Sequence, residues 1–206
     1  MKFLVTAGPT REKIDPVRFI TNYSSGRMGY ALAQAAQQLG HEVILVSGPT
    51  ALPCPAGVER IDVESAAEMA EAVHARSSAA DVIIMAAAVA DYRPAHPETR
   101  KMKKMPGDLT LHLERTEDIL SSLGKSKHPG QLLVGFAAET DDLEKNALDK
   151  LARKNLDWIA ANRVADGFGT ATNRLLLFNK NGEKFDFGSA AKDILAEKML
   201  QTVLNQ

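Results

Sequence analysis

The run Asp81-Val82-Ile83-Ile84-Met85-Ala86-Ala87-Ala88-Val89 decides the fold of this 206-residue chain. Its apolar residues follow one another without the alternation of a strand that has one face in water. The run therefore predicts a strand that is buried on both faces, as in a parallel sheet covered by helices. The rest of the chain must then supply neighbouring strands and two layers of helices.

Strand-like runs and helical patterns alternate on both sides of this run. An apolar stripe that includes Met28 and Leu32 predicts a helix that ends at Gly40, and Ser65 with Glu68 forms a capping box for another. The alternation predicts an α/β fold with a Rossmann-like, mostly parallel sheet flanked by helices. The other expected strands are Lys2–Ala7, His41–Ser47, Arg60–Val63, Leu109–Leu113, Gln131–Ala137 and Asp157–Ala161. The other expected helices are Ser65–Ala75, a helix starting in Glu117–Leu123, Asp141–Lys154 and Ser189–Leu204.

Two segments interrupt this alternation. Asn179-Lys180-Asn181-Gly182 carries an Asn-Gly turn between two short apolar runs, which predicts a late β-hairpin at about residues 174–187 that projects from the sheet. Arg93–Asp108 is basic and contains three prolines, which indicates a flap outside the core. Because no linker or repeat divides the chain, residues 1–206 are expected to form a single domain.

Composition excludes several classes of function. The 25 Lys and Arg against 26 Asp and Glu give a net charge of −1, so the chain has no overall attraction to nucleic acid or acidic membranes. No apolar stretch reaches the ~20 residues of a membrane span. One cysteine, Cys54, excludes an internal disulfide framework, and the histidines lack metal-ligand spacing. We therefore expect a cytoplasmic protein that binds neither nucleic acid nor membrane.

Unusual residues follow the first expected strand, where open parallel sheets bind ligands. Ser24-Ser25-Gly26 precedes a helix, so its hydroxyls and backbone N–H groups form a candidate anion site. Arg18 and Arg27 would add positive charge to it. Ordinary helix capping, with Gly26 and Gly29 allowing close packing, explains the same residues, and both readings stay open.

Two further segments are candidates for the same site. The small residues at Ala86–Ala88 allow a flat ligand to approach the backbone, and Asp91 is a metal or ribose ligand or else a helix cap. The flap run Arg100-Lys101-Met102-Lys103-Lys104 either closes over a polyphosphate or is a solvated face. Lys150 and Lys154, one helical turn apart, either add charge to the site or face solvent.

The motif of a dinucleotide-binding fold is missing. Ala7-Gly8-Pro9-Thr10 breaks the Gly-x-Gly-x-x-Gly spacing after the first strand, and Ser47-Gly48 stands where a ribose-binding acid would follow the second. A nicotinamide-dependent reductase is therefore disfavoured. It remains one alternative, and a non-catalytic nucleotide-binding subunit that regulates a partner remains another.

The candidate segments together resemble phosphopantothenoylcysteine synthetase, the ligase of coenzyme A biosynthesis. The motifs occur in the family's order and extend over most of the chain. They are Thr6-Ala7-Gly8-Pro9-Thr10-Arg11-Glu12, Asp15-Pro16-Val17-Arg18, Asn22-Tyr23-Ser24-Ser25-Gly26, Ala87-Ala88-Val89-Ala90-Asp91-Tyr92-Arg93, Lys101-Met102-Lys103-Lys104, Gly135-Phe136-Ala137-Ala138-Glu139-Thr140 and Lys154-Asn155-Leu156-Asp157.

The resemblance implies an activity and its partners. The family joins 4′-phosphopantothenate to L-cysteine, using CTP through an acyl-cytidylate with release of pyrophosphate and CMP, and Mg²⁺ would screen the triphosphate. It forms homodimers in which one subunit often completes the other's site. Because the chain lacks the flavoprotein's decarboxylase half, we expect no flavin and no decarboxylation, and a separate decarboxylase is a possible partner. The strictness of CTP over ATP stays open.

The resemblance also assigns roles to residues of this chain. Asn22 and Lys101 are expected to be catalytic, and we add Arg18 as a phosphate ligand. The expected nucleotide-binding residues are Ala86, Ala87, Asp91, Lys101, Glu117, Asp118, Ile119, Leu120, Phe136, Lys150 and Lys154. The expected substrate-binding residues are Arg18, Asn22, Ser24, Ser25, Gly26 and Ala88. The resemblance assigns no metal ligands, and their identity stays open.

Overall fold

A computed structural model describes residues 1–104, 106–167 and 172–205. The strands are β1 (Lys2–Ala7), β2 (Arg11–Lys13), β3 (Phe19–Thr21), β4 (Glu42–Ser47), β5 (Glu59–Asp62), β6 (Val82–Met85), β7 (Tyr92–Pro94), β8 (Leu113–Arg115), β9 (Leu132–Glu139), β10 (Trp158–Arg163), β11 (Thr172–Asn179) and β12 (Lys184–Ala191). The helices are α1 (Arg27–Gln38), α2 (Ala66–Ser77), α3 (Ile119–Ser126), α4 (Leu143–Arg153), α5 (Val164–Gly167) and α6 (Lys192–Leu204). Among the described residues, none of these helices is both long and apolar enough to cross a membrane.

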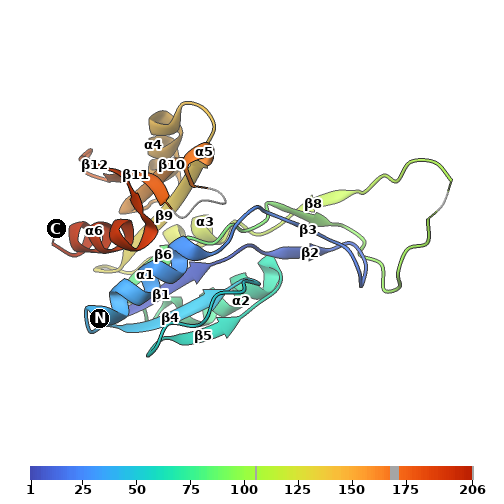
Figure 1. Cartoon of the computed structure of the whole chain (residues 1–206), viewed down its shortest axis with the longest axis horizontal. Helices are drawn as coiled ribbons and strands as arrows, with labels where there is room; N and C mark the ends of the chain where they lie inside the picture. Colours follow the sequence, from blue (N-terminus) through green and yellow to red (C-terminus); the bar gives the residue numbers. More distant parts are fainter. Residues whose placement is uncertain (105, 168–171, 206) are drawn as a thin grey trace.

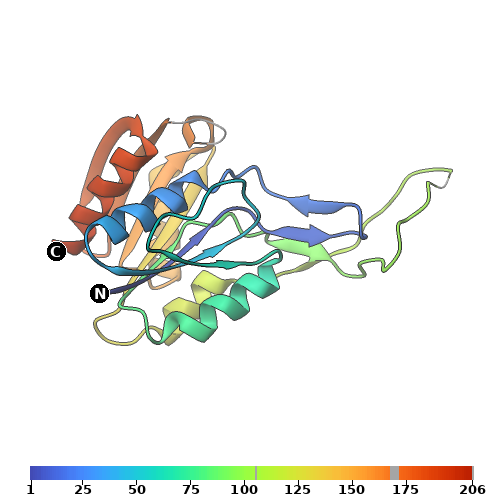
Figure 2. The ribbon, with the colours of Figure 1, turned by 60° about the horizontal axis from the view of Figure 1, so that its bottom comes forward.

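The core is an eight-stranded sheet in the order β12-β11-β10-β9-β6-β1-β4-β5. All neighbouring strands from β10 to β5 are parallel, which confirms the predicted Rossmann-like sheet. Figure 2 shows helices on both of its faces. Phe3 and Val5 of β1 point into a cluster with α1 and α6, whereas Leu4 points into a second cluster with α2, α3 and α4. Burial on both faces explains why the central strands lack alternation.

The strand order reverses beside β1, and this reversal locates the ligand-binding edge. From β1 the chain moves outward through β4 and β5, and α2 then returns it to β6 on the other side of β1. The loops after β1 and β6 meet there, where the Ala88 N–H donates to the Gly8 carbonyl at 2.9 Å and the Thr10 N–H donates to the Ala88 carbonyl at 3.2 Å. Such a switch point is where open α/β sheets bind ligands.

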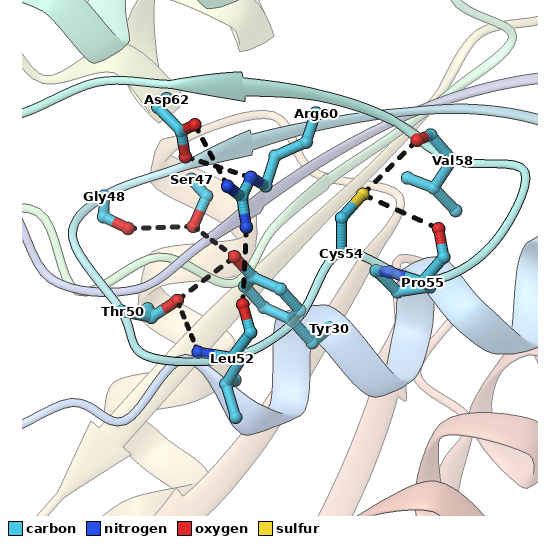
Figure 3. A network of polar contacts seen from close by, with 10 residues as sticks. All are labelled: Tyr30, Ser47, Gly48, Thr50, Leu52, Cys54, Pro55, Val58, Arg60 and Asp62. Carbon is cyan, nitrogen blue, oxygen red and sulfur yellow. Dashed lines mark hydrogen bonds and ion pairs between the residues drawn. The ribbon is translucent and has the colours of Figure 1, made fainter.

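The first turn of α1 is anchored to the end of β4, as Figure 3 shows. The Tyr30 hydroxyl lies 3.0 Å from the Ser47 Oγ and accepts a hydrogen bond from the Thr50 Oγ1 at 3.1 Å. Arg60 of β5 donates to the Leu52 carbonyl at 3.3 Å and so holds the same loop to the sheet. These contacts fix the start of α1 at the switch point.

The late hairpin forms where the Asn-Gly turn predicts it, but the expectation that it projects is wrong. Strand β11 pairs antiparallel with β10 and β12 pairs with β11, so the hairpin extends the central sheet. Leu175 and Leu177 are fully buried, and the Phe185 ring lies 6.0 Å from that of Trp158. These apolar side chains need a partner surface, and docking on β10 supplies it.

A different part of the chain projects. We call residues 11–21, 92–104 and 106–115 the arm; it consists of the β2–β3 hairpin, the β7–β8 ribbon and the connecting flap, and it extends far from the sheet (Figure 1). The Glu98 N–H donates to the Ile14 carbonyl at 2.8 Å and ties the two ribbons together. The expected strand Leu109–Leu113 begins only at Leu113, which corrects that prediction.

Candidate functional site

A cleft of about 270 Å³ opens at the switch point, between the starts of α1 and α6 and the carboxyl ends of β6, β9 and β10. Many of the residues that sequence analysis placed at one site line it. These are Ser24, Ser25, Gly26, Ala86, Ala87, Ala88, Asp91, Phe136 and Lys150. The structure thus brings together segments that are more than a hundred residues apart in the chain.

One wall of the cleft is the start of α1. Gly26 is the N-cap residue with φ 75°, and its position provides no side-chain cap for the helix. A Cβ on Gly26 would lie 2.8 Å from the Thr50 Cγ2, and one on Gly29 would lie 2.5 Å from the Ala7 Cβ. The glycines therefore allow close packing, and they also bring a helix N-terminus without a side-chain cap to the cleft. Its N–H groups and positive dipole end suit an anion.

The floor is the loop that follows β6. The predicted strand continues to Val89, but the observed strand ends at Met85, because Ala88 bonds to the loop after β1 instead of to a neighbouring strand. The Asn22 Nδ2 donates to the Ala88 carbonyl at 3.1 Å and to the Val89 carbonyl at 3.3 Å. Asn22 thereby braces the floor, although it is not among the residues that line the cleft.

Charged side chains surround the β9 end of the cleft. The Lys150 Nζ donates to the Phe136 carbonyl at 2.7 Å, and the Lys154 Nζ donates to the Asp118 Oδ1 at 2.9 Å. Burial, and then the charge of Lys154, lower the pKa of Lys150. Burial acts to raise the pKa of Asp118, but the hydrogen bonds from Lys154 and the Ser121 N–H outweigh it and lower that pKa. The lowered pKa keeps the Asp118 carboxylate ionised at neutral pH, next to Lys154.

In the turn Glu117–Leu120, most side chains are engaged elsewhere in the fold, so a ligand would reach mainly its backbone. The Ile119 and Leu120 side chains are only 3% and 8% exposed and lie in the hydrophobic cluster with α2. The Glu117 Oε1 lies 2.7 Å from the His74 Nε2, so this side chain is held against α2. A ligand at this turn would meet backbone groups and the Asp118 carboxylate.

Arg18 and Lys101 lie in the arm and do not line the cleft of their own chain. The Arg18 guanidinium pairs with the buried Asp15 carboxylate and also donates to the Met102 carbonyl at 3.4 Å. Lys101 is exposed beside them. Hydrogen bonds from Arg18 hold the pKa of Asp15 well below its usual value. Because the Met102 N–H also donates to the Asp15 carboxylate, the ion pair ties the flap to the tip of the β2–β3 hairpin. The roles assigned to both cations stay predictions.

Three polar residues of the cleft lie outside all the segments that the sequence indicated as candidates. Asn162 is the second-last residue of β10, Asn173 lies at the start of β11, and Lys192 is the first residue of α6. Asn162 carries a recognisable signal, because it is the first polar residue after an apolar parallel strand. The other two reach the cleft only because the hairpin docks on β10.

The cleft fits a metal ion that arrives with a phosphate ligand. Among the described residues, no group of three or more His, Cys, Asp and Glu side chains gathers to hold a metal. The Asp91 carboxylate lines the cleft together with the start of α1. Mg²⁺ commonly takes one or two protein carboxylates and completes its octahedron with substrate phosphates and water. Asp91 is therefore the residue that would hold it.

Comparisons with known proteins identify relatives of this chain. The family model of the DNA/pantothenate metabolism flavoprotein C-terminal domain matches residues 1–206. The coenzyme A biosynthesis bifunctional protein CoaBC of Bacillus subtilis is 52% identical over 204 residues, which covers 97% of this chain and 50% of that protein. The same protein of Escherichia coli is 43% identical over 212 residues, with 100% and 52% covered. The chain thus spans about half the length of these curated relatives.

Solved structures agree. The C-terminal domain of the bifunctional protein CoaBC matches with a TM-score of 0.85 and 47% identity, over 98% of this chain and 93% of that one. A mutant of Cab2, solved in complex with phosphopantothenate-cysteine, has a TM-score of 0.81 over 99% and 85% of the two chains, but at 17% identity it shows the fold alone. The predicted resemblance is confirmed: the chain belongs to the family of the DNA/pantothenate metabolism flavoprotein C-terminal domain.

Proposed function

We propose that this chain is a phosphopantothenate–cysteine ligase, which joins 4′-phosphopantothenate and L-cysteine in coenzyme A biosynthesis. The observation that carries the proposal is the cleft at the switch point. It combines a helix N-terminus without a side-chain cap, a floor of small residues and the half-buried Lys150, which donates to the Phe136 carbonyl. Membership of a family whose relatives are named for coenzyme A biosynthesis supports it.

The proposed reaction has two steps, with CTP as co-substrate. A carboxylate oxygen of 4′-phosphopantothenate attacks the α-phosphorus of CTP, and the bond from that phosphorus to pyrophosphate breaks. The cysteine amine then attacks the acyl carbonyl, the bond to the cytidylate oxygen breaks, and CMP leaves while the amine loses a proton. Both steps develop negative charge on phosphate oxygens, which a helix N-terminus and fixed cations stabilise.

Each part of the cleft has a role in this proposal. The Ser24–Gly26 segment binds a phosphate group, and the Ala86–Ala88 floor and Phe136 receive the cytidine. Lys150 contributes charge within the cleft; outside its lining residues, the backbone of the Glu117–Leu120 turn contacts the base and Lys154 adds charge. Asn22, which holds the floor through two carbonyls, supports conversion of the acyl-cytidylate with its Oδ1.

Mg²⁺ enters this proposal as a companion of the triphosphate, and Asp91 would hold it. Bound there, the ion would screen the negative charge of the phosphates. The remainder of the proposal is that residues 1–206 act as one nucleotide-binding ligase domain.

The proposal includes a homodimer in which the arm of one subunit reaches the cleft of the other. Two observations support this arrangement. The arm extends away from the central sheet (Figure 1), and Lys101 lies beside Val17, Arg18 and Leu109 instead of lining the cleft of its own chain. The arm also exposes apolar side chains, with Val17 at 58% and Leu109 at 56% exposure, and such a surface is typical of an interface.

Release of pyrophosphate tests the function directly. The protein is incubated with Mg²⁺, 4′-phosphopantothenate and either CTP or ATP, with and without cysteine. We expect release of pyrophosphate that requires 4′-phosphopantothenate and prefers CTP, and CMP that appears only when cysteine is added. Nucleotide binding without any release, by a folded sample, would instead establish a regulatory subunit. Binding of NADPH by such a sample would favour a reductase.

A further inference from the structure

The part of the cleft farthest from the β6 floor along the sheet has no role in the reaction described so far. It is formed by Asn162, Asn173 and Lys192, from β10, β11 and α6. Antiparallel β11 begins beside the carboxyl end of β10, and Thr172 pairs with Ala191, the residue before α6. The hairpin thereby delivers a buried amide and a buried lysine to the same edge as the nucleotide-binding residues.

Asn173 contributes a hydrogen-bond acceptor that lacks a donor. Its side chain is only 4% exposed, and its Oδ1 has no hydrogen-bond partner within the described part of the chain. Leaving a buried carbonyl oxygen unpaired costs about 1–3 kcal/mol, so native proteins seldom do so without a reason. Because Asn173 lines the cleft, a ligand with an N–H or O–H group would satisfy it.

Lys192 contributes a cation that is largely withdrawn from water. It is 8% exposed and begins the 13-residue α6, whose N-cap residue Ala191 offers no side-chain cap. Burial, and then the nearby charge of Arg27, lower the pKa of Lys192. Positive charge next to a helix N-terminus is the arrangement that receives a carboxylate or a phosphate.

We propose that this part of the cleft binds the α-amino acid group of cysteine, with Lys192 and the start of α6 on its carboxylate and Asn173 Oδ1 accepting from its amine. The inference rests on the proposed ligase function and names the subsite of its second substrate. A fully ionised phosphate would interact with Lys192 but would offer no hydrogen to the Asn173 Oδ1. An amino acid carries both groups on one carbon, which matches a cation and an acceptor that lie in one small cleft.

A neutral acceptor also suits a nucleophilic amine. A carboxylate at the position of Asn173 would stabilise the ammonium form, whose nitrogen has no free lone pair. The amide oxygen accepts from the amine without adding negative charge. Asn173 and Lys192 would thus position the amine for attack on the acyl carbonyl without taking a proton from it.

The test compares cysteine with cysteamine, which has the same thiol and amine but no carboxylate. For Lys192→Met we expect kcat/KM for cysteine to fall about 10- to 100-fold, the effect of losing a charge-assisted hydrogen bond, while kcat/KM for cysteamine stays unchanged. For Asn173→Ala we expect kcat/KM to fall for both amines, because both carry the donor. Lys198→Met, an exposed lysine of the same helix, is the control and should change neither.

The first half-reaction, which needs no cysteine, distinguishes a cysteine subsite from a structural or phosphate-binding role of the same residues. Release of pyrophosphate without cysteine should be unchanged in both variants, with unchanged KM values for CTP and 4′-phosphopantothenate. Equal losses for cysteine and cysteamine in Lys192→Met, or a loss of cysteine-independent release, would overturn the subsite and assign Lys192 to structure or to phosphate. If the unmodified protein releases no pyrophosphate at all, the ligase function itself fails.

Discussion

Asp157 shows at the scale of one residue how this fold holds a buried charge. Its side chain is 4% exposed and accepts hydrogen bonds from Lys127 at 2.8 Å, from Lys180 at 2.7 Å and from the Leu133 N–H at 2.9 Å. Burial acts to raise the pKa of Asp157, but these donors outweigh it and lower the pKa. The carboxylate joins α3, the hairpin turn and two strands at the edge of the sheet opposite the cleft.

Replacing Asp157 should make the unfolding free energy less dependent on pH. We expect Asp157→Asn to lose about 3 kcal/mol of unfolding free energy at pH 7, because two cations keep their positions without a counter-charge. Because the pKa of Asp157 is depressed in the folded state, its carboxylate stabilises the fold at pH values above the usual carboxyl pKa, and this stabilisation is lost as pH falls toward the folded pKa. The difference in unfolding free energy between the two proteins should therefore narrow below about pH 5. Urea unfolding from pH 7 to about pH 3 measures both the loss at neutral pH and its narrowing in acid.

The matched control for this prediction is Lys180→Met. The Lys180 side chain is 60% exposed, so its removal should change the unfolding free energy by less than about 1 kcal/mol. A difference between Asp157→Asn and the unmodified protein that stays constant from pH 7 to about pH 3 would contradict the assigned ion pairs.

Residues of the cleft differ in how far the sequence could reveal them. Asp91 and the Ser24–Gly26 segment lie in the connections that follow the parallel strands β6 and β1, and the carboxyl ends of such strands share one edge of a sheet. Lys192 follows an antiparallel strand and Asn173 begins one, so that rule does not reach them. Their place depends on which strand the hairpin joins, and the hairpin's own sequence does not specify that partner.

At the scale of elements, the contact between α1 and β1 determines the shape of the cleft. Gly29 lies in the first turn of α1, and a Cβ there would be 2.5 Å from the Ala7 Cβ and 2.7 Å from the Thr6 carbonyl oxygen. Since a strand at the centre of a sheet cannot give way, the helix would have to move. That movement would carry the Ser24–Gly26 segment away from the floor of the cleft.

Gly29→Ala should therefore weaken both the fold and nucleotide binding. We expect a loss of about 2–3 kcal/mol in unfolding free energy, as for overpacked cores, together with a weaker affinity for CTP in calorimetric titration. Gly130→Ala is the control: with φ 83° and no heavy atom within 4 Å of the added Cβ, it should cost about 1 kcal/mol and leave binding unchanged. Equal effects of the two variants would contradict the close contact.

Elements with strong local signals were predicted well, and short ones were not. The Asn-Gly turn and the alternating strands beside it specify a hairpin by themselves. Strands β2 and β3 have three residues each and enclose Pro16, so the sequence predicts a loop over Gly8–Ser25. Their pairing is stabilised by contacts with the β7–β8 ribbon, which comes from a distant part of the chain.

At the scale of the whole molecule, the position of the arm predicts which residues each subunit of a dimer contributes to a site. In the proposed dimer, Lys101 of one subunit acts at the cleft that contains Asn22 of the other. Lys101→Ala should fold normally and lose nearly all turnover. Asn22→Asp should also lose turnover, because a carboxylate cannot donate to the Ala88 and Val89 carbonyls and would repel an anionic intermediate.

Mixed dimers of these two variants test the arrangement. If the arm serves the partner's cleft, each mixed dimer contains one site with both residues intact. Co-expression that yields half mixed dimers should then restore about a quarter of the unmodified activity. The control is each variant co-expressed with itself, which should restore none. Mixed dimers that form but stay inactive would place Lys101 at its own subunit's cleft, and normal turnover by Lys101→Ala would remove it from the mechanism.

The two outer strands of the sheet limit how this protein can associate. Strand β5 has four residues and exposes Glu59, Arg60 and Asp62, while β12 exposes Lys184 and Asp186 and contains Gly188 with φ 67°. Charged, short or bent borders discourage a foreign strand from adding to the open row of amide groups. The edge strands therefore disfavour open-ended, strand-by-strand association into fibrils. Association of two copies is left to other surfaces, which can form a closed dimer.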